Sequence, residues 1–122
     1  MALTGISVVS VPVADQERSL AFYRDTLGFE VKTDAEFGAG MRWLELQPPC
    51  GGASVTLVTW LDEMPPGSLQ GIVLGTDDIV ADHDRLSAQG IEFTGPPAAQ
   101  PWGTFASFSD PDGNSWILVQ SS

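Results

Sequence analysis

The sequence predicts an α+β fold made of two successive βαβββ modules. Residues 8–29 read as an alternating strand, a capped amphipathic helix and a glycine stop. The same order returns from residue 71, and further β-rich runs follow each helix. A four-stranded sheet from one half would leave one face bare. We therefore expect modules at about residues 4–61 and 69–121 to form a single domain over residues 1–122.

The first module begins with a strand and a helix whose apolar faces match. Valines at every second position share one strand face, and apolar residues at i, i+3 and i+7 share one helix stripe. These are Val9, Val11 and Val13 on the strand and Leu20, Tyr23 and Leu27 on the helix. Asp15 is placed to cap the helix, and Gly28 to end it.

Two β-rich runs complete this module, and a proline-bearing turn follows them. The runs are Gly40–Gln47 and Ala53–Trp60, and the turn is DEMPPGS at 62–68. Because the turn has no hydrophobic periodicity, it is predicted to link the two modules.

The second module repeats this order of elements. We expect a capped helix with a glycine stop between its first two strands, and a tight turn between its last two. The strands are Ile72–Thr76, Ile91–Thr94, Gly103–Phe108 and Ser115–Gln120. The helix is Ile79–Gln89, with its cap at Asp77-Asp78 and its stop at Gly90. Pro96-Pro97 lies in a loop, and Asp110–Asn114 forms the turn between the last two strands.

Composition narrows the function classes. There is no run of 18 apolar residues and no secretory signal pattern at the start, so a cytoplasmic protein is expected. A single cysteine, Cys50, excludes an internal disulfide and a cysteine-based metal cluster. A net charge of −11 argues against nucleic-acid and membrane partners. That charge serves solubility, or alternatively attracts a cation.

Three segments carry a resemblance to a known family. VPVADQERSLAFYRDTLGFEV, DDIVADHDRLSAQGIEF and FSDPDGNSWILVQ stand at 11–31, 77–93 and 108–120. In this order they resemble the vicinal oxygen chelate superfamily, which includes glyoxalase I, extradiol dioxygenases and bleomycin-resistance proteins. The resemblance implies paired modules whose mixed sheet curls around a ligand cavity. It also implies a homodimer, in which an exchange of modules between subunits is one possibility.

The same resemblance indicates where a metal would bind. Counting from the motifs, the metal-ligand positions of the superfamily fall at Val8, Thr56, Gly71 and Ile117. A shift by one residue brings in the hydroxyl of Ser7 and a lone glutamine, Gln70, which cannot hold a divalent cation. We therefore expect no metal and no cofactor. The one histidine, His83, is predicted to pack on the inner face of its helix.

Strand parity suggests which side chains line the cavity. On the strand from Met41 to Gln47 either face could point inward, and the face with Trp43 and Glu45 is favoured. Core packing is an equal alternative for Trp43, and a solvated or salt-bridged surface position is an equal alternative for Glu45. An aromatic residue in a Pro/Gly loop suggests a rim position. The predicted ligand-binding residues are Ser10, Trp43, Glu45, Thr56, Trp60, Trp102 and Phe105.

Two functions remain open. The first is a metal-free binding protein that sequesters a cationic or aromatic compound. The second is a lyase, isomerase or dioxygenase-type enzyme of the superfamily, for which Glu45 is the weak catalytic candidate.

If Glu45 faces an apolar pocket, desolvation should raise its pKa, and a cationic ligand should bind less well as pH falls through that pKa.

Overall fold

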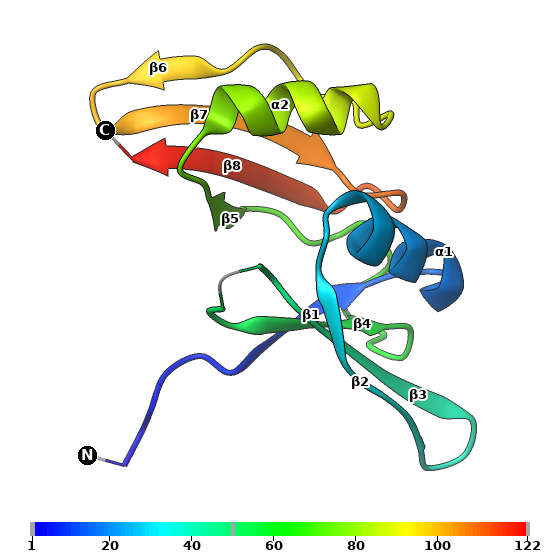
Figure 1. The fold of residues 1–122 in the computed structure, drawn as a ribbon. Helices are drawn as coiled ribbons and strands as arrows, with labels where there is room; N and C mark the ends of the chain where they lie inside the picture. The colour runs from blue at the N-terminus through cyan, green and yellow to red at the C-terminus, as the bar shows by residue number, and fades with distance from the viewer. Residues whose placement is uncertain (1, 50, 122) are drawn as a thin grey trace. The chain divides into compact units, whose positions relative to one another are not determined.

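Two four-stranded sheets make up the structure, which is a computed structural model describing residues 2–49 and 51–121. Each sheet belongs to its own compact unit, Met1–Pro66 (unit 1) or Gly67–Ser122 (unit 2) (Figure 1). Cys50 lies outside the described residues. Within them, every helix is too short or too polar to cross a bilayer.

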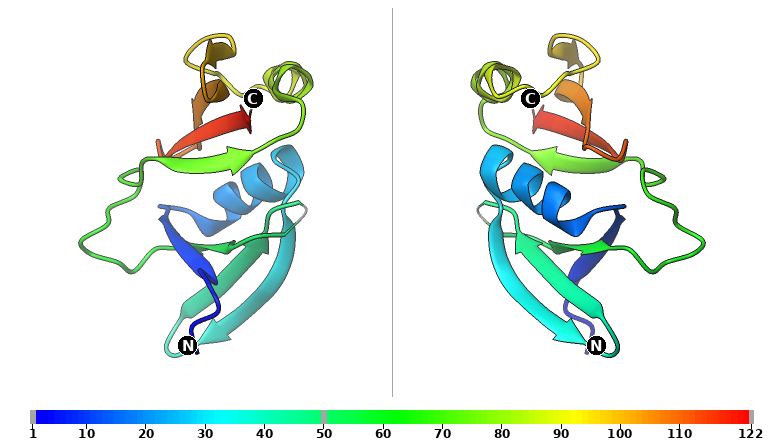
Figure 2. Two further views of the ribbon diagram at one scale, coloured as in Figure 1. Left: turned by 90° about the vertical axis from the view of Figure 1, so that its left-hand side faces the viewer. Right: turned by 90° about the vertical axis from the view of Figure 1, so that its right-hand side faces the viewer.

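Unit 1 contains four strands and one helical segment. The sheet order is β1-β4-β3-β2, with β1 and β4 parallel and the other neighbours antiparallel. Figure 2 shows the helical segment against one face of this sheet. This is the predicted βαβββ module. Its elements are β1 (Val8–Pro12), α1 (Gln16–Leu20), the π-helix η1 (Ala21–Thr26), β2 (Glu30–Phe37), β3 (Met41–Gln47) and β4 (Ser54–Val58).

The predicted ends of the first helix are confirmed. The Asp15 carboxylate accepts hydrogen bonds from the N–H groups of Glu17 (3.0 Å) and Arg18 (3.2 Å). Gly28, at φ +82°, turns the chain out of the helix. The helix widens into η1, where Leu27 N–H bonds to the carbonyl five residues earlier. Five of the six residues of the predicted core stripe are buried, and Val9, near the start of β1, is half-buried. The buried ones are Val11, Val13, Leu20, Tyr23 and Leu27.

Unit 2 repeats the topology, with the order β5-β8-β7-β6. Asp78 caps α2 through the N–H of Ala81 (3.1 Å), and the Gln120 side chain accepts from the N–H of Ile79 (2.7 Å). Gly90, at φ +100°, follows the helix as predicted. The elements are β5 (Ile72–Gly75), α2 (Ile79–Ala88), β6 (Ala98–Gln100), β7 (Gly103–Ser109) and β8 (Ser115–Ser121).

One predicted strand of unit 2 is wrong. Residues 91–94 form a single bridge, Phe93 with Phe108, and β6 lies after Pro96-Pro97 instead. Two consecutive prolines lack N–H donors, so regular pairing with β7 resumes only beyond them. At the start of β7, Gly103 is required, because a Cβ there would lie 2.5 Å from the Gln120 carbonyl oxygen on β8.

His83 packs against aromatic residues of unit 2. Its ring lies 4.3 Å, centroid to centroid, from Phe93, which in turn packs edge-on against Phe108. Leu74 and Phe93 border a buried cluster of Ile79, Ala106 and Leu118. The predicted inward packing of His83 is therefore confirmed.

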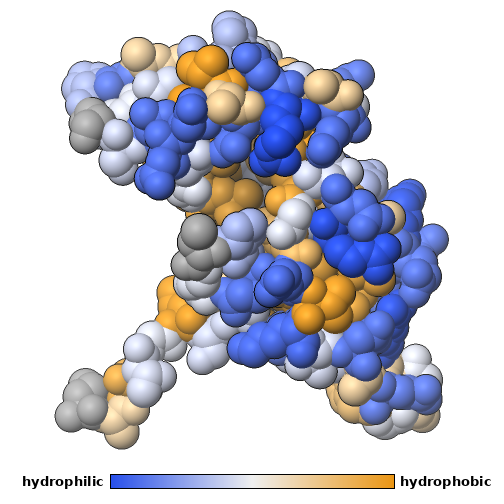
Figure 3. All heavy atoms as spheres, in the orientation of Figure 1, coloured by the Kyte–Doolittle hydropathy of each residue, from blue (hydrophilic) through white to orange (hydrophobic). Residues whose placement is uncertain are grey.

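Figure 3 shows hydrophilic residues over the outer sides of α1 and α2, in keeping with the acidic composition.

The turn between β7 and β8 is held by its own side chains. The buried Asp110 carboxylate accepts from the N–H groups of Asp112 and Asn114 at 2.9 Å each, and from Asn114 Nδ2 at 2.7 Å. The Asn114 side-chain oxygen accepts from the N–H of Leu69 (3.1 Å). The predicted turn is thus a hydrogen-bonded loop that also fixes the chain before β5.

Candidate functional site

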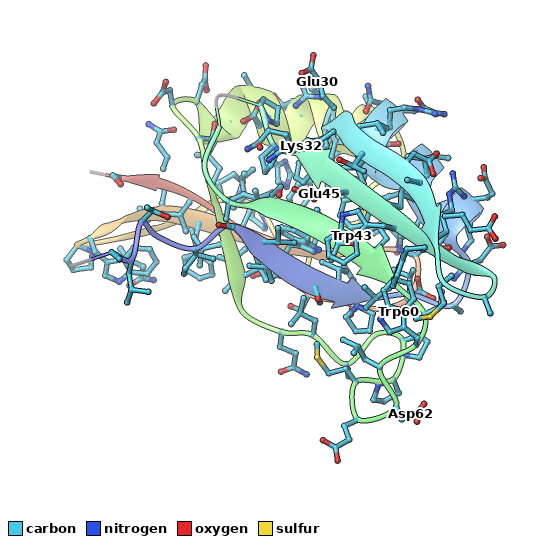
Figure 4. The ribbon with its side chains drawn as sticks, turned by 90° about the horizontal axis from the view of Figure 1, so that it is seen from below. Glu30, Lys32, Trp43, Glu45, Trp60 and Asp62 are labelled. Atoms are coloured by element: carbon cyan, nitrogen blue, oxygen red, sulfur yellow. The ribbon has the colours of Figure 1, made fainter. Side chains whose placement is uncertain are left out.

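The two faces of the unit 1 sheet differ in chemistry. Arg42 on β3 pairs with Glu17 on α1 and with Asp34 on β2 (2.8 Å), so its side chain lies on the face that α1 covers. By alternation, Trp43 and Glu45 lie on the opposite face, which we call the helix-free face. That Trp43 and Glu45 face a ligand remains a prediction. Figure 4 looks onto it.

Strand register aligns three predicted site residues across the helix-free face. Ser10 pairs with Thr56, and Thr56 pairs with Glu45. The Thr56 side chain is fully buried, and its hydroxyl donates to the Leu44 carbonyl (3.1 Å). Thr56 therefore helps to join β4 to β3 and offers a ligand little direct contact.

Glu45 is the polar centre of this face. It is 7% exposed, and Trp43 Nε1 donates to its Oε1 (2.9 Å). The buried Ser54 hydroxyl donates to Oε2, and the Lys32 ammonium lies 3.5 Å from the same oxygen. Strand parity placed Ser54 among the inward-facing side chains, whereas Lys32 was not predicted to be part of the site.

A β-bulge brings Lys32 to this carboxylate. The pairing of β2 with β3 shifts register between Val31 and Thr33, so Lys32 and Thr33 together oppose Glu45. Simple alternation across β2 would not predict this position. Its side chain is 56% exposed, so the ammonium stays in contact with water while it pairs with the buried carboxylate.

The hydrogen bonds to Glu45 reverse the expected shift of its pKa. The hydrogen bond from Ser54 holds the pKa of Glu45 below the ordinary carboxyl value against the cost of burial, and Trp43 and Lys32 lower it further. The prediction of a raised pKa is wrong. Glu45 remains ionised at neutral pH, and a carboxylate of low pKa is a poor general base.

Three aromatic rings form a row beside Glu45. The Phe37 ring packs edge-to-face against Trp43 (6.0 Å, 78°) and against Trp60 (5.3 Å, 74°). Phe37 pairs with Met41, which places it on the helix-free face, and it is 40% exposed. We call these three residues the aromatic row. Phe37 was missed because its strand shows no clear hydrophobic alternation.

Two further predicted residues lie in unit 2. The rings of Trp102 and Phe105 are stacked, with centroids 5.7 Å apart and planes at 26°. Trp102 is 56% exposed. Their role in ligand binding remains a prediction.

The side chains at the superfamily's metal positions do not fit a metal ion. Val8, Gly71 and Ile117 carry no donor atom, and the Thr56 hydroxyl already donates to a backbone carbonyl. Within residues 2–49 and 51–121, no three His, Cys, Asp or Glu side chains cluster as a metal site would require.

The comparison with known proteins settles the family. The model of the Glyoxalase/Bleomycin resistance protein/Dioxygenase superfamily matches residues 5–118. The chain belongs to this superfamily. The name of this superfamily includes both enzymes and binding proteins. Membership therefore determines the fold but leaves more than one function possible.

Three relatives include one named as a binding protein, one uncharacterised protein and one named as an enzyme. TnmS3, an antibiotic binding protein from Streptomyces sp. CB03234, is 46% identical, with a TM-score of 0.93 and coverage of 100% of this chain and 99% of that one. The uncharacterised protein YetH of Bacillus subtilis is 36% identical, over 94% of this chain and 97% of its own. An ethylmalonyl-CoA/methylmalonyl-CoA epimerase of Cereibacter sphaeroides is 31% identical, over 71% and 72% of the two chains.

Proposed function

We propose that this superfamily member binds and sequesters a planar aromatic small molecule, such as an antibiotic with a ring system, on the helix-free face of unit 1. The observation that carries the proposal is the aromatic row, Phe37, Trp43 and Trp60, whose rings meet edge-to-face beside a hydrogen-bonded Glu45. The structural similarity to an antibiotic binding protein supports it.

Ring contacts are the main source of affinity in this proposal. Covering about 100 Å² of apolar surface gains about 2.5 kcal/mol at ~25 cal/mol per Å². An aromatic partner adds about 0.5–1.5 kcal/mol for each well-oriented ring pair. The hydrogen bond from Trp43 Nε1 to Glu45 holds the indole in place before the ligand arrives, which reduces the entropy lost on binding.

The enzyme alternative has one observation in its favour, the epimerase relative. Two features argue against it in this chain. The side chains at the superfamily's metal positions supply a single hydroxyl, and Glu45 has a lowered pKa with donors already bound to both carboxylate oxygens. Those donors also weaken the case for a cationic ligand at Glu45.

A homodimer and a cytoplasmic location remain predictions.

The test removes one ring of the aromatic row. Acridine, an uncharged planar compound, is titrated into the protein, and its affinity is measured by calorimetry. Calorimetry does not depend on which tryptophan dominates the fluorescence. Phe37→Leu is expected to weaken binding about tenfold, or about 1.4 kcal/mol, because it deletes the ring that bridges Trp43 and Trp60.

Phe22→Leu is the matched control for this test. It removes the same atoms from η1, on the other side of the sheet, and should leave the affinity for acridine within about twofold. Equal losses in the two variants, or no loss in Phe37→Leu, would place the ligand elsewhere and refute the proposal.

A further inference from the structure

We propose that Lys32 is the specificity-determining residue of this site, and that the ligand carries an anionic oxygen, a carboxylate or phenolate, beside its aromatic rings. The inference rests on the proposed function and adds the charge class of the ligand. It reverses the cationic preference that the sequence suggested for Glu45.

The position of Lys32 relative to the aromatic row carries the inference. Lys32 and Trp43 bind different oxygens of the same carboxylate, Oε2 at 3.5 Å and Oε1 at 2.9 Å. In Figure 4, Lys32, Glu45, Trp43 and Trp60 follow one another across the helix-free face. A ring system packed on Trp43 therefore places a substituent within reach of the ammonium.

Glu45 orients the Lys32 side chain but leaves N–H donors of its ammonium available to a ligand. An ammonium has three N–H donors, and Glu45 Oε2 already accepts from the Ser54 hydroxyl. The Glu45 side chain is 10% exposed, whereas the Lys32 side chain is 56% exposed, so a ligand meets the positive charge first. Lys32 can thus donate to a ligand oxygen while Glu45 keeps its side chain oriented.

The other basic side chains of unit 1 lie away from this face. Among the residues of unit 1 that the structure describes, Arg18 and Arg24 lie on the helical segment, and Arg42 is bound on the face covered by α1. The protein carries a net charge of −11, which repels an anion at long range. Selection of an anionic ligand therefore depends on one local contact, the ammonium of Lys32.

The test compares three ligands of one shape and different charge: acridine-9-carboxylate, acridine and 9-aminoacridinium. Calorimetry on the full chain is expected to give the carboxylate about tenfold tighter binding than acridine, and the cation no advantage over acridine. Lys32→Gln should abolish the preference for the carboxylate and leave the affinity for acridine within about twofold. Lys32→Arg should retain most of it.

Arg24→Gln controls for net charge. It removes the same charge from η1, where Arg24 pairs with Asp25, and should leave the preference intact. A carboxylate preference that survives Lys32→Gln, or tighter binding of the cation, would overturn the inference.

The inference and the proposed function fail in different ways. If all three ligands bind, depend on Phe37 and show no charge preference, the aromatic site stands and the role of Lys32 is wrong. If none of them binds, the proposed function fails and the inference fails with it.

Discussion

Replacing Asp110 by alanine is expected to lower the free energy of unfolding by about 3 kcal/mol. The carboxylate is buried and accepts from two backbone N–H groups, those of Asp112 and Asn114, and from the Asn114 amide. Alanine would leave these donors without their acceptor inside the β7–β8 turn. Asn114 would also lose the contact that orients it toward Leu69. Urea unfolding followed by fluorescence measures the loss.

Asp84→Ala is the control for Asp110. It makes the same change of charge on α2, where the Asp84 side chain is 78% exposed, and should change stability by less than about 0.5 kcal/mol. Asp110→Asn, which keeps one acceptor oxygen, should fall between the two. A loss below about 1 kcal/mol in Asp110→Ala would show that the loop forms without its carboxylate.

Glu45→Gln is expected to destabilise the protein by about 2 kcal/mol at neutral pH. The carboxylate accepts from Ser54 and Trp43 and pairs with Lys32, and a neutral amide weakens all three interactions. Since Lys32 is largely exposed, its ion pair supplies little of this effect, and the two hydrogen bonds supply most.

The cost of Glu45→Gln should depend on pH in a defined direction. The pKa of Glu45 is lowered in the folded protein, so its contribution is complete above the ordinary glutamate pKa of about 4.3 and disappears as pH falls through the lower folded value. The difference in stability between wild type and Glu45→Gln should therefore close on acidification below about pH 4. Other carboxylates are present in both proteins and cancel in the difference.

Glu36→Gln provides the comparison for this measurement. Glu36 is exposed on β2, so the same substitution there should have a small effect on stability at neutral pH. A stability gap for Glu45→Gln that persists or widens at acidic pH would contradict a lowered pKa at Glu45.

Much of the fold could be predicted because its signals are local. The cap at Asp15 and the stop at Gly90 each depend on a few adjacent residues, and both were confirmed. The strand at Ile91–Thr94 was wrong, since pairing there depends on how β7 lies and on where Pro96-Pro97 interrupts the chain.

The candidate site was less predictable, because its chemistry comes from contacts between strands. Parity correctly placed Trp43 and Glu45 on one face, but it could not place Lys32, whose side chain reaches Glu45 through a β-bulge. The direction of the Glu45 pKa shift also depended on Ser54, nine residues away on β4. Burial alone suggests a raised pKa, and only the hydrogen-bond partners reverse it.

Ligand binding at the aromatic row is tested most directly by an NMR titration of nitrogen-labelled protein with acridine, read at the indole N–H groups. The Trp43 and Trp60 resonances are expected to shift together as acridine binds, because both rings belong to the aromatic row. The resonance of Trp116, buried in unit 2, should stay in place. Binding that is measurable by calorimetry while the Trp43 and Trp60 resonances remain unchanged would show that the aromatic row does not bind the ligand.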